Sequence, residues 1–398
     1  MKKGSGMRQL LAVLLAVWMA AAGALGAAAQ EEKKQVAMSF TARSALLMEQ
    51  QTGKVLFSQN ETQRVAPASL TKLMDLFQQL QSGKLTMEQE LTCSAYAKTM
   101  GGSEIWLKEG ERMTVEELLK ALVVASANDA AVVFAEAIAA SEEEFVRLMN
   151  EKAQQLGLQN THFVNCTGFD EEGHYTCAQD VAVLARELMT GYGEQLTRFS
   201  TIWMDSLRGG ETQLVNTNRL IRFYDGATGL KTGTTDAAGH CLCATATRDG
   251  LSLISVIMGC KSSDARFEES RQLLDYGFAG FTLYQPQLPQ DRLHPVAVKQ
   301  GMQTQVEPQV EALPQAVVRK NEVDGIEIKL ELSEQLQAPV AKGQAIGWIQ
   351  LVQNGSIIAQ QPVTAGQEVQ QLTYAKSLRL LAKGLIGMNG QSVCEQVE

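Results

Sequence analysis

The spacing of apolar residues divides the first 280 positions into strands at both ends and helices between them. Alternating apolar positions predict a hairpin over residues 44–59. A second hairpin, with strands over 242–247 and 251–258, turns at Asp249-Gly250, a dipeptide that favours tight β-turns. Helical spacing and capping signals predict five helices: residues 70–81, a helix opened by Thr114 and Glu117, residues 141–157, residues 176–191, and a helix from Ser263 through Leu274. This order predicts an α+β fold in which one antiparallel sheet, built from both ends, packs against a helical cluster.

The pattern changes near residue 282, where Gln, Val and Pro become frequent and apolar runs become short. Strict alternation over 326–332 predicts a half-buried strand, and Asn354-Gly355 predicts a further hairpin turn. Residues 282–372 are therefore predicted to form a small all-β domain.

The last periodic segment, residues 373–389, predicts an amphipathic helix. Apolar residues such as Tyr374 and Leu378 share one face, and basic residues such as Lys376 share the other. A basic amphipathic helix can lie in a membrane surface. The alternative is a helix docked on its own protein.

The N-terminus has the layout of a secretory signal peptide. Lys2, Lys3 and Arg8 precede an apolar run over 10–25, and small residues follow it. We predict a signal peptide over 1–29 and export of the mature chain; the alternative is an uncleaved membrane anchor.

Composition and charge exclude several classes of protein. The chain has 398 residues, of which 45% are hydrophobic and 20% charged, a balance typical of globular domains. Its net charge of -9 argues against nucleic-acid binding. The four histidines lack metal-ligand spacing, so we expect no metal and no cofactor. We interpret most of the seven cysteines as small buried apolar residues, with a Cys166–Cys177 disulfide left open.

Three short motifs follow one another along the chain: S-x-x-K at Ser69 and Lys72, S-x-N at Ser126 and Asn128, and K-T-G beginning at Lys231. Alone, each is weak, because solvated side chains on a helix or ordinary helix caps produce the same letters. Together and in this order they indicate an active-site serine.

The first motif joins a nucleophile to a base. A serine hydroxyl needs a base, and Lys72 lies one helical turn from Ser69 on the same face. Burial and a second cation, Lys231, would both lower the pKa of Lys72 and leave it neutral. Backbone N–H groups near Ser69 would favour a developing oxyanion.

The other two motifs supply relay and binding groups. Ser126 can relay a proton to the leaving amine, and Asn128 can orient Lys72 and hold the substrate amide. We predict that Lys231, Thr232 and Gly233 lie on an edge strand that pairs with an extended peptide. Gly233 would then admit the substrate backbone, and Lys231 and Thr232 would receive its carboxylate. The Thr234 N–H is the candidate second oxyanion donor.

These motifs, read with their neighbours, resemble the D-alanyl-D-alanine carboxypeptidases, the low-molecular-mass penicillin-binding proteins of serine peptidase family S11. The resemblance rests on the strings over residues 67–74, 126–130 and 225–235 and on shorter matches at 149–150, 156–163, 216–218 and 238–239.

The resemblance implies a fold of the serine β-lactamase/DD-peptidase type over 36–280, followed by the β-domain and the membrane-associating helix. It implies removal of the terminal D-alanine from peptidoglycan pentapeptides through an acyl-enzyme on Ser69, with Lys72 as general base. Stem peptides and β-lactam antibiotics, as covalent inhibitors, are the implied partners. Lys231 would bind the substrate carboxylate, and Arg266 would lie near the site; the alternative for Arg266 is an exposed helix position. The implied location is the outer face of the cytoplasmic membrane.

Two departures keep other functions open. Ala127 stands where many members have Gly, and the helix after Ser69 is shorter and more polar than the resemblance leads us to expect, beginning with Asp75. This altered helix motivates a catalytically weak or inactive scaffold as an alternative. A serine β-lactamase is the other alternative, but no E-x-x-L-N motif lies between the second and third motifs; Glu171 and Glu172 have a different context.

Overall fold

The structure, a computed structural model, describes residues 38, 40–287, 292–378 and 382. Its helices are η1 (Ala68–Thr71), α2 (Lys72–Ser82), η2 (Ala97–Thr99), α3 (Val115–Lys120), the π-helix η3 (Ala121–Ala125), α4 (Asn128–Ala139), α5 (Glu142–Gln155), α6 (Ala178–Ser200), η4 (Arg208–Gly210), α7 (Leu220–Phe223), α8 (Ser263–Gly280) and η6 (Lys320–Gly325). Its first ten strands are β1 (Ser44–Glu49), β2 (Val55–Gln59), β3 (Glu90–Thr92), β4 (Arg112–Thr114), β5 (Met204–Leu207), β6 (Thr212–Val215), β7 (Ala227–Thr235), β8 (Gly239–Arg248), β9 (Leu251–Cys260) and β10 (Phe281–Tyr284).

The later strands are β11 (Val296–Lys299), β12 (Gln305–Val306), β13 (Pro308–Gln309), β14 (Ala316–Arg319), β15 (Ile326–Leu332), β16 (Gln335–Gln337), β17 (Ala345–Gln353) and β18 (Ser356–Ala365). Seven of them form a four-stranded sheet in the order β13-β18-β17-β15 and a three-stranded sheet in the order β12-β11-β16, while β14 pairs with β10. The predicted strand and the hairpin at Asn354-Gly355 are confirmed as β15 and the β17–β18 turn. These sheets make up the predicted all-β region.

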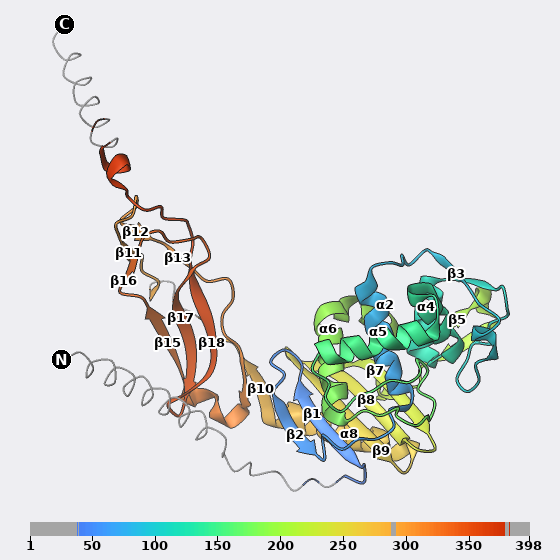
Figure 1. Cartoon of the computed structure of the whole chain (residues 1–398). Helices are drawn as coiled ribbons and strands as arrows, with labels where there is room; N and C mark the ends of the chain where they lie inside the picture. Colours follow the sequence, from blue (N-terminus) through green and yellow to red (C-terminus); the bar gives the residue numbers. More distant parts are fainter. Residues whose placement is uncertain (1–37, 39, 288–291, 379–381, 383–398) are drawn as a thin grey trace, which may run out of the picture. The chain divides into compact units, whose positions relative to one another are not determined.

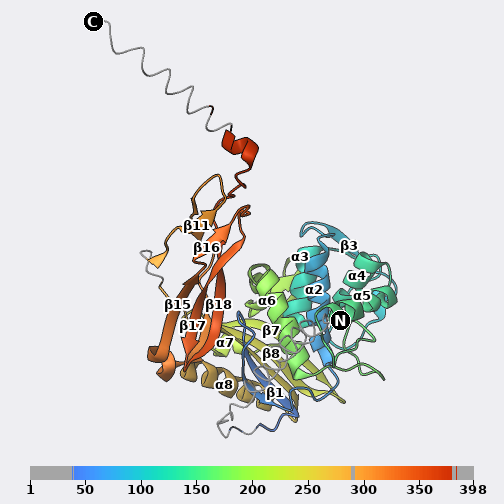
Figure 2. The ribbon, with the colours of Figure 1, turned by 60° about the vertical axis from the view of Figure 1, so that its left-hand side comes forward.

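One antiparallel sheet, in the order β2-β1-β9-β8-β7, joins the two ends of the first 280 residues (Figure 1). Side chains alternate between the two faces of the sheet along each strand. Both faces are buried along β1 and β9. On one face Met48 packs into the core of the helical cluster. On the other, Leu47 and Leu253 lie against Gly277 of α8, where a Cβ would meet them at 2.9 and 2.5 Å. The predicted α+β arrangement is confirmed (Figure 2).

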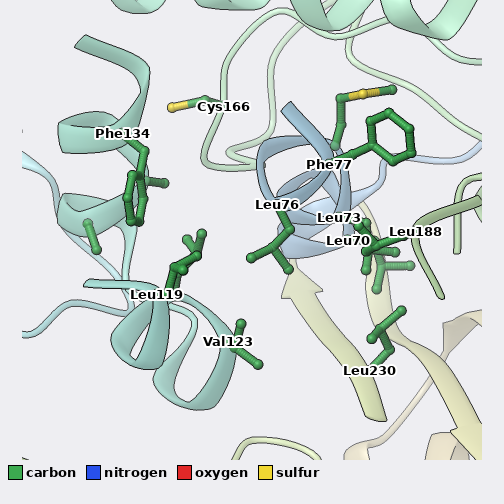
Figure 3. Close-up of a cluster of buried hydrophobic side chains, with 14 of the residues drawn as sticks. Leu70, Leu73, Leu76, Phe77, Leu119, Val123, Phe134, Cys166, Leu188 and Leu230 are labelled. Atoms are coloured by element: carbon green, nitrogen blue, oxygen red, sulfur yellow. The ribbon is translucent and has the colours of Figure 1, made fainter. Parts of the chain in front are cut away.

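The central helix α2 is held by its apolar face. Leu73, Leu76 and Phe77 are buried in the core that Figure 3 shows, beside Leu230 of β7 and Leu188 of α6. The helix ends at Gly83, whose φ of 58° suits a left-handed C-terminal cap. The shorter, more polar sequence after Ser69 therefore still forms a buried helix.

The prediction for the helix at 176–191 was wrong at both ends. Thr176 pairs its backbone with Val65 in an isolated bridge, so the cap moves to Cys177, whose Sγ accepts from the Asp180 N–H. The helix then continues past Gly191 to Ser200. Buried contacts of residues such as Leu196 outweigh the helix cost of a glycine, about 1 kcal/mol.

The last helix of this region was also misplaced. Ser262, rather than Ser263, caps α8 by accepting from the Ala265 N–H, and α8 runs past Leu274 to Gly280. The Ser263 hydroxyl is instead engaged by Arg266. Neighbouring serines have equal capping chemistry, so only their contacts separate them.

The cysteines in the described part of the chain are free and buried, so Cys166 and Cys177 form no disulfide; Cys394 lies outside it. Cys241 and Cys243 both face the helical cluster, because residues two apart on a strand share a face. The predicted signal peptide also lies outside the described residues. The predicted end helix is described as helical over 374–378 and at 382, and Tyr374 is 86% exposed. Among the described residues, no helix combines the length and the apolar character needed to cross a bilayer.

Candidate active site

The Ser69 hydroxyl and the Lys72 amine lie together where η1 continues into α2. Lys72 Nζ is 3.2 Å from Ser69 Oγ, and the Lys72 side chain is entirely buried. The i, i+3 spacing of the motif produces this contact, because residues one turn apart share a helix face. The nucleophile and base proposed from the sequence are therefore in hydrogen-bond contact.

Two further groups hold the Lys72 amine. Nζ donates to Asn128 Oδ1 at 2.6 Å and to the Thr167 carbonyl at 2.6 Å. The amide of Asn128 is oriented by its Nδ2, which donates to the Gly101 carbonyl. Both partners of Nζ only accept hydrogen bonds. A neutral amine has two hydrogens to give them, so its lone pair is left for the Ser69 proton.

Burial prepares Lys72 for this role. It lowers the pKa of Lys72 from 10.5 to about 8, against the opposing effects of Asp75, Cys166 and Asp129. The pKa of Lys231 is lowered well below its usual range by burial first, and then by the nearby cations Lys72 and Arg266. Burial is the largest cause of the low pKa of Lys72. The repulsion between the two amines acts on both of them, so the expected effect of Lys231 on the pKa of Lys72 stays a prediction.

The third motif lies on β7, the predicted edge strand of the sheet. Lys231 and Gly233 pair with Cys243 and Cys241, which face the helical cluster. Lys231 is buried, and its Nζ donates to the Thr232 carbonyl at 3.0 Å. Both amines of the proposed site thus lie on the helical side of the sheet.

Gly233 also has a structural role that we did not predict. A Cβ there would lie 3.0 Å from Ala68 Cβ, 3.1 Å from the Ser69 nitrogen and 3.2 Å from the Pro67 carbonyl oxygen. The glycine therefore lets β7 approach the turn that carries the nucleophile, rather than only the substrate.

Arg266 braces the same strand from α8. One guanidinium nitrogen donates to the Gly233 carbonyl at 3.0 Å, to Thr234 Oγ1 at 2.9 Å and to the Cys241 carbonyl at 3.3 Å. Arg266 is 8% exposed, so it does not occupy the exposed position that we considered as an alternative. Since the C=O and N–H of one trans peptide group point in opposite directions, the Thr234 N–H points away from the Gly233 carbonyl that Arg266 binds.

A loop over 165–170 closes on the nucleophile from its other side. Gly168 has φ of +91°, and a Cβ there would lie 2.0 Å from the Ala68 carbonyl oxygen. Asp170 ties the loop to the end of β7 by accepting from Thr235 Oγ1 at 2.6 Å and from the Ala237 N–H at 3.0 Å. We did not foresee this loop, because Thr167 contributes a backbone carbonyl, which leaves no side-chain signal in a sequence.

A buried histidine, His174, is hydrogen-bonded to Thr71 of the first motif. His174 Nδ1 accepts from the Val164 N–H at 2.9 Å, so its Nε2 carries the proton and donates to Thr71 Oγ1 at 2.8 Å. Thr71 Oγ1 in turn donates to the Ala68 carbonyl. Burial lowers the pKa of His174 to about 4, which keeps the ring neutral.

The second motif lies between η3 and α4. Ser126 adopts a left-handed conformation (φ 63°) and is 3% exposed; its hydroxyl has no hydrogen-bond partner among the described residues. Asn128 begins α4 two residues later and reaches Lys72. Hydrogen bonds thus connect Ser69, Lys72 and Asn128. Ser126, two residues before Asn128, has a buried hydroxyl without a partner among the described residues.

Comparison with known proteins gives consistent matches along the chain. The family model described as D-alanyl-D-alanine carboxypeptidase matches residues 29–262, and the model described as penicillin-binding protein 5, C-terminal domain, matches 286–371. The D-alanyl-D-alanine carboxypeptidase DacF of Bacillus subtilis (strain 168) is 38% identical over 381 residues, covering 94% of this chain and 97% of its own.

Solved structures agree. Penicillin-binding protein 5 from Haemophilus influenzae has a TM-score of 0.75 at 29% identity, covering 84% of this chain and 99% of its own. Penicillin-binding protein D2 from Listeria monocytogenes, in its ampicillin-bound form, has a TM-score of 0.56 at 27% identity, covering 61% of this chain and 99% of its own.

Proposed function

Because the chain belongs to the D-alanyl-D-alanine carboxypeptidase family, we propose that Ser69 is its acylated nucleophile and Lys72 the base that activates Ser69. The chain is a serine-type D-Ala-D-Ala carboxypeptidase that binds penicillin. The observation that carries the assignment of roles is the set of three contacts of Lys72 Nζ. Asn128 and Thr167 accept the two hydrogens of a neutral amine, which would leave its lone pair for the Ser69 proton.

The first half of the reaction forms an ester. Lys72 takes the hydroxyl proton as Ser69 Oγ bonds to the carbonyl carbon of the penultimate D-alanine. The amide C–N bond then breaks, and the terminal D-alanine leaves after its nitrogen gains a proton. Ser126, with its unpartnered buried hydroxyl, is the proposed relay for that proton. Water hydrolyses the ester in the second half.

Backbone N–H groups are proposed to stabilise the oxyanion. The Ser69 nitrogen lies 3.1 Å from the position that a Gly233 Cβ would occupy, so β7 and the nucleophile turn are adjacent. The Ser69 and Thr234 N–H groups are the proposed pair of donors, and such donors are each worth about 10²–10³ in rate.

Cations on and behind β7 are proposed to bind the substrate carboxylate. An anionic carboxylate would favour the charged form of Lys231, whose pKa is low in its absence. Thr232 and Arg266 are assigned to the same task. Arg266 already fixes Gly233 and Thr234, so it also holds the strand to which the peptide would pair.

The experiment that tests these roles measures release of free D-alanine from a pentapeptide ending in D-Ala-D-Ala. Ser69→Ala and Lys72→Ala should each lose at least about 10³-fold in kcat/KM. Labelling by a fluorescent penicillin should vanish in Ser69→Ala. Ser82→Ala and Lys84→Ala change the same residue types at the far end of α2 and should retain wild-type rates. A labelled Ser69→Ala protein would overturn the assignment.

A β-lactamase activity is disfavoured by the loop over 165–170 and the residues after it. Glu171 is exposed, and its Oε2 accepts from Asn165 Nδ2 at 3.2 Å. We therefore expect slow deacylation after penicillin binds. Rapid turnover of a chromogenic cephalosporin by purified protein would reverse this conclusion.

The domain bounds, the export and the membrane association of the enzyme are also part of our proposal. We propose a catalytic domain over 36–280, a β-domain over 282–372, export directed by residues 1–29, and association of the end helix, 373–389, with the outer face of the cytoplasmic membrane. The exposed Tyr374 and Leu378 support an apolar contact there. Flotation with anionic vesicles tests it: the chain truncated after residue 372 should lose vesicle binding and keep D-alanine release.

A further inference from the structure

Asp75 is an acidic side chain in the interior of the protein with no visible partner. It lies on α2 one turn after Lys72 and is 0% exposed. Both carboxyl oxygens lack a hydrogen-bond partner among the described residues. Lys72 Nζ contacts Ser69, Asn128 and Thr167 and makes no hydrogen bond to Asp75, so Asp75 acts on the amine through its charge.

Charged and titratable groups face Asp75 from several elements. Lys72 of α2 and Lys231 of β7 favour its anion, whereas Glu142 of α5 opposes it. Cys166 lies in the loop over 165–170, and the charges of Asp75 and Glu142 both raise the pKa of its thiol. Its backbone N–H donates to Glu142 Oε1 at 2.9 Å. The remaining charged group acting on Lys72 is Asp129 of α4.

An ionised carboxylate without hydrogen bonds is costly in such a place. Burial raises the pKa of Asp75 well above its usual range, in the direction of a neutral acid. The lysine and the acid can then hold one proton between them in two ways: as an uncharged amine beside an uncharged acid, or as an ammonium beside a carboxylate. Only the first arrangement leaves a lone pair for Ser69.

We propose that Asp75 is a positioning residue that competes with Lys72 for this proton and thereby sets the pH at which Lys72 becomes a base. The inference rests on the proposed role of Lys72. When Asp75 keeps its proton, Lys72 can release its own; when Asp75 ionises, the amine stays charged and acylation stops.

The test is the pH dependence of acylation by a fluorescent penicillin, in wild type and in Asp75→Asn. The substitution keeps the shape of the side chain and removes the competing acid. The acid limb of the profile should move down by about one pH unit, since a nearby opposite charge shifts a pKa by this order. On that limb Asp75→Asn should be about tenfold faster than wild type.

Matched variants separate the charge from the packing. Asp75→Thr also removes the acid and should show the same displacement. Gln79→Met changes another buried polar group one turn further along α2, with a shape close to that of glutamine, and should keep the wild-type profile. Unchanged acid limbs in both Asp75 variants would overturn the inference. If Lys72→Ala acylated normally, the assignment of the base would fail instead.

A measurement on unaltered protein covers the case in which neither variant folds. Infrared spectra of protein carrying ¹³C-carboxyl aspartate at pH 6 should contain a protonated-carboxyl band. Absence of this band would show that Asp75 has already lost its proton before Lys72 loses its own, so that the two groups share no proton, which contradicts the proposal.

Discussion

Replacing Gly168 by alanine tests whether the loop over 165–170 holds the nucleophile in place. The new Cβ would lie 2.0 Å from the Ala68 carbonyl oxygen and 2.8 Å from the Ser69 nitrogen, and contacts under 3.0 Å essentially never occur. The neighbours are backbone atoms, so no side chain can rotate to relieve the overlap. One of the two segments must move by about 1 Å.

Such a movement should be seen in the rate. It separates the Thr167 carbonyl from Lys72 or displaces Ser69, and a misplacement of about 1 Å can cost about 10²-fold. We therefore expect Gly168→Ala to be acylated by penicillin about a hundredfold more slowly in stopped-flow fluorescence. Left-handed backbone at φ +91° adds about 1–2 kcal/mol of strain to the variant.

Gly173→Ala is the matched control. It lies just beyond the same loop with φ of +85°, but a Cβ there meets only Val164 Cγ2 at 3.7 Å and His162 Nδ1 at 3.9 Å. Gly173→Ala should lose only the stability that the left-handed backbone costs, and only Gly168→Ala should lose the hundredfold in rate. Equal acylation rates in the two variants would refute the idea that the loop positions the nucleophile.

Three further predictions concern protonation and support. The rate of acylation should rise with pH through about 8, because Lys72, with a pKa of about 8, is a base only when neutral. At pH 6 the rate should be about a hundredfold below its plateau. A rate that stays constant from pH 6 to 9 would contradict this. The pKa of His174 falls from 6.5 to about 4 on folding, so the folded state disfavours the protonated ring. Thermal unfolding should therefore show a stability that is fully present above pH 6.5 and falls by up to about 3 kcal/mol as the pH falls toward 4. His174→Ala should no longer show this loss, whereas a change at the exposed His294 should leave it unaltered. Arg266→Lys keeps the charge but loses the planar guanidinium, one nitrogen of which holds Gly233 and Thr234. D-alanine release should fall about tenfold in kcat/KM, and wild-type kinetics would show that the guanidinium geometry is dispensable.

Local chemistry made much of the structure predictable. The hairpin at Asp249-Gly250 follows from residues that accept positive φ, here 49° and 79°. The contact between Ser69 and Lys72 follows from helix geometry alone. The placement of the third motif on an edge strand followed from the order of strands and turns. The first two features depend only on neighbours within a few positions, so the sequence contains their cause.

Long-range packing decided what the sequence could not show. The continuation of α6 past Gly191 depends on buried contacts of its later turns. The close approaches of Gly168 and Gly233 to the turn before Ser69 join segments far apart in the chain. The sequence marked Asp75 only as an unusually polar residue, since burial and the absence of a partner exist only once α2 is enclosed. Backbone carbonyls such as that of Thr167 are identical in every residue type, and only the tertiary structure selects the one that Lys72 meets.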